Sequence, residues 1–340
     1  MMMSTIKDVA VRVFYATGLA ALSLKEAGRG KALILAYHHV IPRKVIRESS
    51  LMTGMYLSSQ SFEDHLDWLS RHFRVVPLET IVEMIRTGLP WKETLCALTF
   101  DDGWKDVYDH ALPLLRRYDM PATVFSVGSM VGSQGPQGLD GVFEAIQMTD
   151  RPDDLRTGVA EIDALIRSDA IPDRVEKARM VINQIRELPY EQCREICATI
   201  NRYLHDTFDL DPVRWKYETM SWDDMREAQG DAVDFGYHSK THPILTKVPR
   251  SLLDAEVVPP FEEYKKEGVL LKPIFCYPDG KFTDEAISVL EEEGYEGAVT
   301  LQKGYNDSGT DPFLLKRVNI HEGNGGNRSR FVLSIGMRNR

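Results

Sequence analysis

Cysteine is scarce in this chain of 340 residues, and no two cysteines form a CxxC pair. The four are Cys96, Cys193, Cys197 and Cys276. Cys193 and Cys197 stand four residues apart in an apparent helix, where such side chains share a face. Free cysteine is among the most buried residue types, so we expect buried thiols rather than a metal or redox motif. Nothing here calls for an oxidising compartment.

The chain also lacks an excess of positive charge and a run of apolar residues long enough to span a membrane. The formal net charge is −10, which argues against nucleic acid as the main partner because phosphate binding relies on Lys and Arg clusters. The apolar stretch at residues 13–24 is shorter than the roughly 20 residues that cross a bilayer, and no signal-peptide cleavage site is evident. We predict that residues 1–30 form an amphipathic helix and linker, docked on the body or in peripheral contact with a membrane. The expected location is cytoplasmic, or peripheral at the cytoplasmic membrane.

Strand-like and helix-like segments alternate through the rest of the chain. Residues 31–40 (KALILAYHHV) have a strand pattern, and residues 60–73 carry apolar side chains at spacings of three and four, which predicts a helix. The alternation gives about seven strands with intervening helices, typical of an α/β fold with parallel strands. No glycine-rich nucleotide turn follows the first strand, which favours a closed or nearly closed (β/α)7 barrel over a doubly wound sheet. Residues 31–340 are the predicted barrel domain, with a mostly helical, lid-like insertion at about 137–220.

Four of the predicted strands end in residues that can carry chemistry. Active sites of such barrels lie where strands end, so these groups are expected to meet. Neighbours on a strand point in different directions, so two adjacent aspartates can hold two roles, one as a metal ligand and one as a proton acceptor. A plain surface turn is the alternative for Asp-Gly. The four strand ends are Tyr37-His38-His39, Asp101-Asp102, His238 and Tyr277-Pro278-Asp279-Gly280.

His238 and His242 stand four residues apart and are candidate metal ligands beside the two aspartates. If the segment between them turns helically, both imidazoles fall on one face and can bind one ion. Two histidine nitrogens and one carboxylate oxygen form a typical open catalytic metal site. Asp102 or Asp101 would supply the carboxylate.

Three motifs in this order, TFDDGW, HSKTH and FCYPDG, resemble those of the polysaccharide deacetylase family, carbohydrate esterase family 4, also called the NodB-homology family. The segments ILAYHHV, PATVFSVG, GYEGAVT and GTDPFLLKRVNI are also similar to family segments. The resemblance covers residues 31–340 and is weakest in the helical insertion. It implies a distorted (β/α)7 TIM-like barrel and a metal-dependent deacetylase of N-acetylated carbohydrate.

The resemblance also implies roles for individual residues. Asp101 corresponds to the general base, and Asp102, His238 and His242 correspond to the ligands of a divalent metal, usually zinc, with Co²⁺, Ni²⁺ or Mn²⁺ as alternatives. A backbone N–H of the third motif, here at Asp279 where the family usually has Tyr, would stabilise the oxyanion together with the metal.

The chain departs from the family pattern at three further places. Cys276 occupies the place of an arginine that pairs with the base in many members, and we hypothesise that Arg317 supplies that charge. The general acid of the family lies in a Leu-x-x-His motif, which here becomes His321 preceded by Val318. The fourth motif, which tunes that histidine, is not recognisable.

Two aromatic residues near the predicted strand ends are further candidates. His38 is expected near the site and His39 to pack outward, because neighbours alternate. Trp104 is a second candidate for the lining of the site, and core packing explains it equally well.

The motifs encode cleavage of a C–N bond and do not name the leaving amine. A deformylase or an amidohydrolase of another small N-acyl substrate on the same fold is therefore the alternative activity. A catalytically silent glycan-binding homologue is the alternative outside enzymes, because the third-motif arginine is missing and the late motifs are altered. A glycosidase is disfavoured, because adjacent residues cannot straddle a glycosidic bond at the required separation of about 5 to 9 Å.

Overall fold

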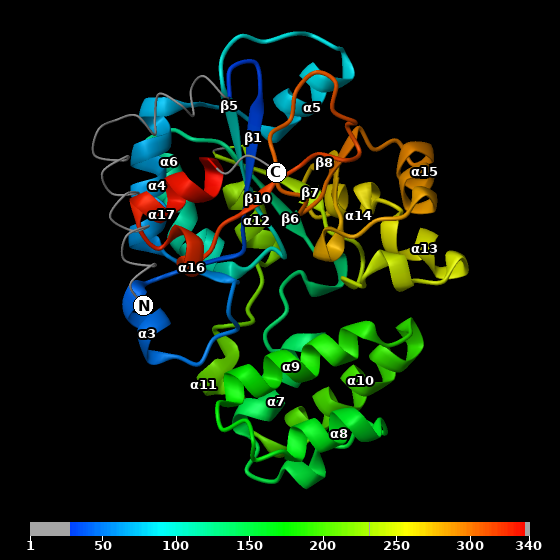
Figure 1. Cartoon of the computed structure of the whole chain (residues 1–340). Coiled ribbons are helices and arrows are strands. Elements are labelled where there is room, and N and C mark those ends of the chain that lie inside the picture. Colours follow the sequence, from blue (N-terminus) through cyan, green and yellow to red (C-terminus); the bar gives the residue numbers. More distant parts are fainter. Residues whose placement is uncertain (1–27, 231, 337–340) are drawn as a thin grey trace.

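The computed structural model describes residues 28–230 and 232–336, and a curled parallel sheet is its centre (Figure 1). The order of strands is β10-β1-β5-β6-β7-β8-β9, all parallel, with β4 (Arg74–Val75) beside the start of β5. This architecture confirms the prediction of an α/β fold of the distorted TIM-like barrel type. The strands of the main path are β1 (Ala32–Tyr37), β5 (Leu95–Phe100), β6 (Ala122–Ser126), β7 (Val233–Tyr237), β8 (Leu271–Cys276), β9 (Gly297–Val299) and β10 (Val318–Asn319).

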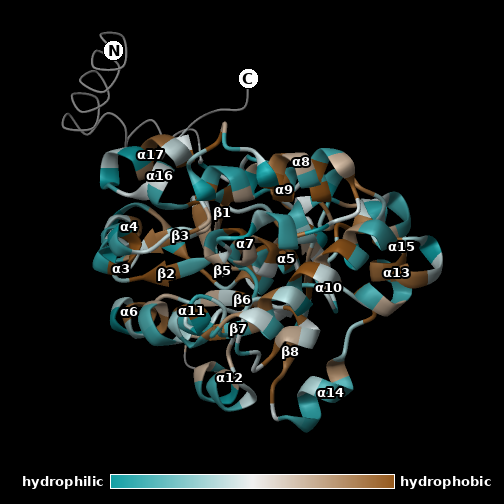
Figure 2. Cartoon of the chain, turned by 90° about the horizontal axis from the view of Figure 1, so that it is seen from below, coloured by the Kyte–Doolittle hydropathy of each residue, from teal (hydrophilic) through white to brown (hydrophobic). Residues whose placement is uncertain are grey.

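The strand sequences explain their central position. All six residues of β1 (ALILAY) and of β5 (LCALTF) are buried. Strands covered on both faces have near-continuous apolar runs rather than alternation. Figure 2 shows hydrophobic colour in the middle of the molecule and hydrophilic colour on outward turns of the surrounding helices.

Helices cover the sheet, and a second small sheet lies beside it. The small sheet pairs β2 (His39–Ile41) with β3 (Tyr56–Ser58) in parallel. Pro259-Pro260 separate α13 from α14. The covering helices are α3 (Arg43–Glu48), α4 (Ser59–His72), α5 (Leu78–Arg86), α6 (Leu112–Tyr118), α12 (Trp222–Ala228), α13 (Arg250–Val257), α14 (Phe261–Lys266), α15 (Asp284–Glu292), α16 (Glu322–Gly325) and α17 (Arg328–Gly336).

A block of helices between β6 and β7 forms the insertion and lies apart from the sheet in Figure 1. It has its own apolar cluster, which includes Val142, Ile182 and Ile200. Its helices are α7 (Gly138–Met148), α8 (Ala160–Arg167), α9 (Arg174–Glu187), α10 (Tyr190–Thr207) and α11 (Asp211–Arg214).

The predicted N-terminal amphipathic helix lies outside the described residues, so its membrane contact stays a prediction, as does the cellular location. Among the helices that the structure describes, none is long and apolar enough to cross a membrane.

Candidate metal centre and active site

The two adjacent aspartates follow directly after β5, where the chain turns sharply. Asp102 and Gly103 both have positive φ, 73° and 77°. The turn sends the two carboxylates to different partners, Asp101 to Arg317 and Asp102 to two histidines. Both aspartates are buried, with 2% and 7% of their surface exposed, so neither is a plain surface turn residue.

The side chains of Asp102, His238 and His242 converge on one point. His238 Nε2 lies 3.5 Å and His242 Nε2 lies 3.4 Å from Asp102 Oδ1, and the two nitrogens are 3.2 Å apart. The segment between the histidines is not helical: Ser239 and His242 have positive φ, 64° and 59°. The imidazoles therefore meet through a tight loop, and the conditional expectation of a helical turn is wrong.

This donor set fits a divalent cation. Ligand atoms about 2.1 Å from a tetrahedral ion lie about 3.4 Å from one another, close to the three distances here. His238 Nδ1 donates to the Cys276 carbonyl at 2.7 Å, which leaves Nε2 free as a ligand. Trp104 Nε1 donates to Asp102 Oδ2 at 2.9 Å and leaves Oδ1 for the ion.

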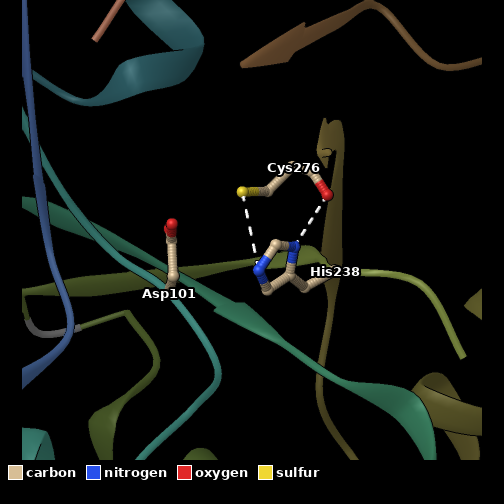
Figure 3. A group of neighbouring side chains, drawn as sticks. All are labelled: Asp101, His238 and Cys276. Atoms are coloured by element: carbon tan, nitrogen blue, oxygen red, sulfur yellow. Dashed lines mark hydrogen bonds between the residues drawn. The ribbon is translucent and has the colours of Figure 1, made fainter. Parts of the chain in front are cut away.

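A second group, Asp101, His238 and Cys276, also brings three ligand types together (Figure 3). It suits a cation less well because both carboxylate oxygens of Asp101 already accept from Arg317. Burial also raises the pKa of the Cys276 thiol well above its usual value, and the thiolate is the metal ligand. Since His238 belongs to both groups, the set with Asp102 is the better metal centre.

Arg317 forms a two-bond ion pair with Asp101 in the interior. Its Nη1 and Nη2 donate to the two carboxylate oxygens at 2.7 and 2.8 Å, and no part of Arg317 is exposed. Burial alone would raise the pKa of Asp101, but the charge and hydrogen bonds of Arg317 outweigh it and hold that pKa well below its usual range. Asp101 is therefore ionised at neutral pH. The predicted pairing of Arg317 with the base position is present in the geometry.

His38 and His39 point to different surroundings. His38 Nε2 lies 3.9 Å from Asp101 Oδ2, which places His38 beside the site. His39 is buried and its Nδ1 lies 2.6 Å from Asp106 Oδ2. The His39 ring stacks on Trp104, with centroids 4.4 Å apart. Trp104 is 3% exposed, so it contacts the metal centre through Asp102 and offers no open stacking face for a sugar.

The loop after β8 carries Tyr277, Pro278, Asp279 and Gly280 to the same end of the sheet. Asp279 adopts a left-handed conformation, with φ 58° and ψ 11°. Gly280 also has positive φ, and a Cβ there would lie 2.5 Å from the Leu301 nitrogen. Tyr277 is fully buried, so its ring packs in the core.

His321 caps the start of α16. Its Nδ1 accepts from the Gly323 amide at 3.1 Å, so the proton of the neutral ring is on Nε2. Partial burial lowers the pKa of His321 and the neighbouring His38 lowers it further. The role of His321 as general acid stays a prediction.

The insertion brings two charged residues near the site that no sequence motif predicted. Desolvation, with a smaller contribution from the charge of Asp102, raises the pKa of Asp140, in the first turn of α7, to about 7. Arg186, at the end of α9, lies with Nη2 3.1 Å from Asp279 Oδ1. Their positions depend on how the insertion docks, which no local pattern encodes.

Comparison with known proteins finds sequence similarity to polysaccharide deacetylases in part of the chain. A family model described as "Polysaccharide deacetylase" matches residues 90–166, which include both aspartates. The "Putative polysaccharide deacetylase YxkH" of Bacillus subtilis is 30% identical over 111 residues, 32% of this chain and 36% of that protein. The poly-β-1,6-N-acetyl-D-glucosamine N-deacetylase of Staphylococcus epidermidis is 28% identical over 113 residues, 31% of this chain and 39% of that protein. The chain thus spans well under half the length of these curated relatives.

Solved structures of low sequence identity share the fold over nearly the whole chain. The Streptococcus pyogenes deacetylase PplD in complex with acetate has a TM-score of 0.57 and 14% identity, covering 90% of this chain and 99% of its own. IcaB from Ammonifex degensii also has a TM-score of 0.57, with 17% identity, covering 91% of this chain and 98% of its own. The chain is therefore similar in sequence to the polysaccharide deacetylase family over residues 90–166, and the solved structures share its fold.

Proposed function

We propose that this protein is a metal-dependent N-deacetylase that hydrolyses the acetamide of N-acetylated sugars in a polysaccharide. One observation carries the proposal: Asp102, His238 and His242 form a cation-sized set of ligand atoms 3.2 to 3.5 Å apart, beside a separately ionised Asp101. A metal site with only a structural role would not need a second carboxylate, paired with an arginine, beside the ligands.

Each residue has a distinct task in this reaction. A divalent cation, with zinc as our first candidate, would polarise the acetamide carbonyl and make water more acidic. Asp101, held ionised by Arg317, accepts the proton of the attacking water. The amide of Asp279 donates to the oxygen that gains negative charge. His321 gives a proton to the leaving amine.

Support for an acetylated sugar as substrate comes from the relatives. The staphylococcal relatives are named as deacetylases of poly-β-1,6-N-acetyl-D-glucosamine, and oligomers of that sugar are the first substrate to test. Removal of a formyl group or of another acyl group would use the same residues and is the second candidate.

The test compares acetate release from N-acetylglucosamine oligomers with bound metal, for the wild type and three variants. Asp101→Asn should keep the metal and lose at least about 100-fold in kcat, because it removes the proton acceptor. Asp102→Asn and His242→Gln should lose both metal and activity, because each removes a ligand. His110→Gln, outside the metal centre, is the matched control.

Two outcomes would contradict the proposal. Wild-type protein that binds the oligomers with metal in place but releases no acetate would be the silent glycan-binding homologue. Equal acetate release by wild type and Asp101→Asn would remove Asp101 from the chemistry.

A further inference from the structure

The C-terminal end of α9 contacts two loops of the metal centre. Arg186 Nη2 lies 3.1 Å from Asp279 Oδ1, on the loop after β8. Lys247 Nζ donates to the Leu188 carbonyl at 3.2 Å and to the Arg186 carbonyl. Lys247 ends the short turn that follows His242. We call Arg186, Leu188, Lys247 and Asp279 the α9 clasp, since they attach the insertion to both loops.

The clasp holds Asp279 in a strained backbone conformation. Asp279 is left-handed, a conformation that costs a residue other than glycine about 1 to 3 kcal/mol. Its Oδ1 contacts Arg186, and its Oδ2 lies 3.3 Å from Lys281 Nζ. The carboxylate is thus fixed from two sides, one of them the insertion.

The position of Arg186 is not explained by packing within the insertion. Its Nε is buried and has no acceptor among the described residues, and a buried donor without a partner costs free energy. The ion pair with Asp279 is partly exposed, with side chains 35% and 23% accessible. Such pairs add little to folding stability, so the contact is better explained by the geometry it imposes on Asp279.

We propose that Arg186 is a positioning residue: through the carboxylate of Asp279 it keeps the backbone amide of Asp279 aimed at the reacting carbonyl. The helical insertion then takes part in the catalytic geometry rather than only covering the site. This inference rests on the proposed deacetylase function, in which that amide stabilises the oxyanion.

Steady-state kinetics on N-acetylglucosamine oligomers give the first test. Arg186→Ala should lower kcat about tenfold and change KM less than about twofold, because a misplaced donor weakens the transition state more than substrate binding. Arg186→Lys should recover most of the rate. Asp279→Asn should lower kcat similarly, and the double variant should be no slower than either single one, because both changes break one contact.

Arg179→Ala is the matched control, since Arg179 lies on the same helix and pairs with the exposed Glu176. It should leave kcat and KM unchanged. If Arg186→Ala behaves like Arg179→Ala, or raises KM alone, the positioning role is wrong.

Amide hydrogen exchange gives a second test that needs no activity. Arg186→Ala should speed exchange in residues 277–282 about tenfold, while α7 and α10 keep wild-type protection. If the wild type releases no acetate, the proposed function is wrong. The exchange measurement still tests whether Arg186 orders the loop of residues 277–282. Unchanged exchange in residues 277–282 would overturn the positioning role of Arg186. Faster exchange throughout the insertion would also contradict it, because the variant would then have unfolded the insertion.

Discussion

At the scale of single residues, the buried arginine of the site is fully supplied with acceptors. Besides its two bonds to Asp101, Arg317 donates from Nε to the Thr300 carbonyl at 2.8 Å and from Nη1 to Thr99 Oγ1 at 3.1 Å. Its Nη2 lies 3.2 Å from Cys276 Sγ. A buried charge is tolerated when it is paired and hydrogen-bonded. Cys276 thus stands beside the guanidinium.

Replacement of Arg317 by Ala should cut turnover at least about 100-fold while leaving bound metal intact, because no metal ligand contacts it. Loss of the guanidinium leaves burial as the dominant influence, so the pKa of Asp101 rises and the acid limb of kcat/KM moves to higher pH. The measurement is a pH–rate profile with metal analysis, and Arg330→Ala on the exposed side of α17 is the control. Unchanged turnover would dismiss the role of Arg317.

The sequence could predict that some of these residues lie together, but it could not predict the backbone conformation that brings them together. Asp101, Asp102, His238 and His242 follow short motifs at strand ends, so their meeting could be predicted. The loop conformation that joins the histidines could not. Ser239 and His242 have positive φ, and residues distant in sequence hold this loop, for example through the hydrogen bond from the Gly128 amide to the Ser239 carbonyl at 3.0 Å.

At the scale of elements, long buried strands and amphipathic helices were predictable, and very short ones were not. β1 and β5 each carry six consecutive buried residues, whereas β4 and β10 have two residues each and no pattern of their own. The docking of α4 against α16 and α17 is also invisible in the sequence. It centres on His65, which is fully buried and whose Nε2 donates to the Gly325 carbonyl at 2.8 Å. The His65 ring stacks on Phe331 at 3.8 Å.

The burial of His65 between α4, α16 and α17 should make the free energy of unfolding depend on pH. Burial lowers the pKa of His65 to about 3 in the folded protein, against about 6.5 in the unfolded chain. Between these values the unfolded chain binds a proton that the folded protein does not, so the free energy of unfolding falls with decreasing pH by up to about 1.4 kcal/mol per unit.

Urea unfolding of metal-free protein at pH 7, 6 and 5 tests this. His65→Gln should be less stable at pH 7 because the ring contact is lost. It should then lose less stability than the wild type on acidification. His72→Gln on the same helix controls for removal of an imidazole. Parallel pH dependence in the wild type and His65→Gln would contradict the assignment.

At the scale of the whole molecule, two apolar cores are joined by polar contacts. The insertion packs around its own cluster, and the three remaining clusters together form the core of the sheet domain. Glu144 of α7, which is 1% exposed, accepts from Lys216 Nζ at 2.7 Å and from Tyr217 OH at 2.8 Å. Together with the α9 clasp, these bonds fix where the insertion stands, so geometry at the site depends on contacts that contribute little apolar burial.

Two cores with a polar junction should unfold in two steps when one of them is weakened. Ile185→Ala removes a fully buried side chain from the insertion and should cost about 2 to 5 kcal/mol locally. Four of the five tryptophans lie outside the insertion and Trp215 directly follows α11, so fluorescence reports mainly the sheet domain, whereas far-UV circular dichroism reports both parts. In urea, Ile185→Ala should lose helical signal at a concentration where fluorescence is still native. Leu33→Ala, in the core of the sheet, should instead lower the midpoint seen by fluorescence. Coincident transitions by both probes in Ile185→Ala would mean that the polar junction couples the cores into one cooperative unit.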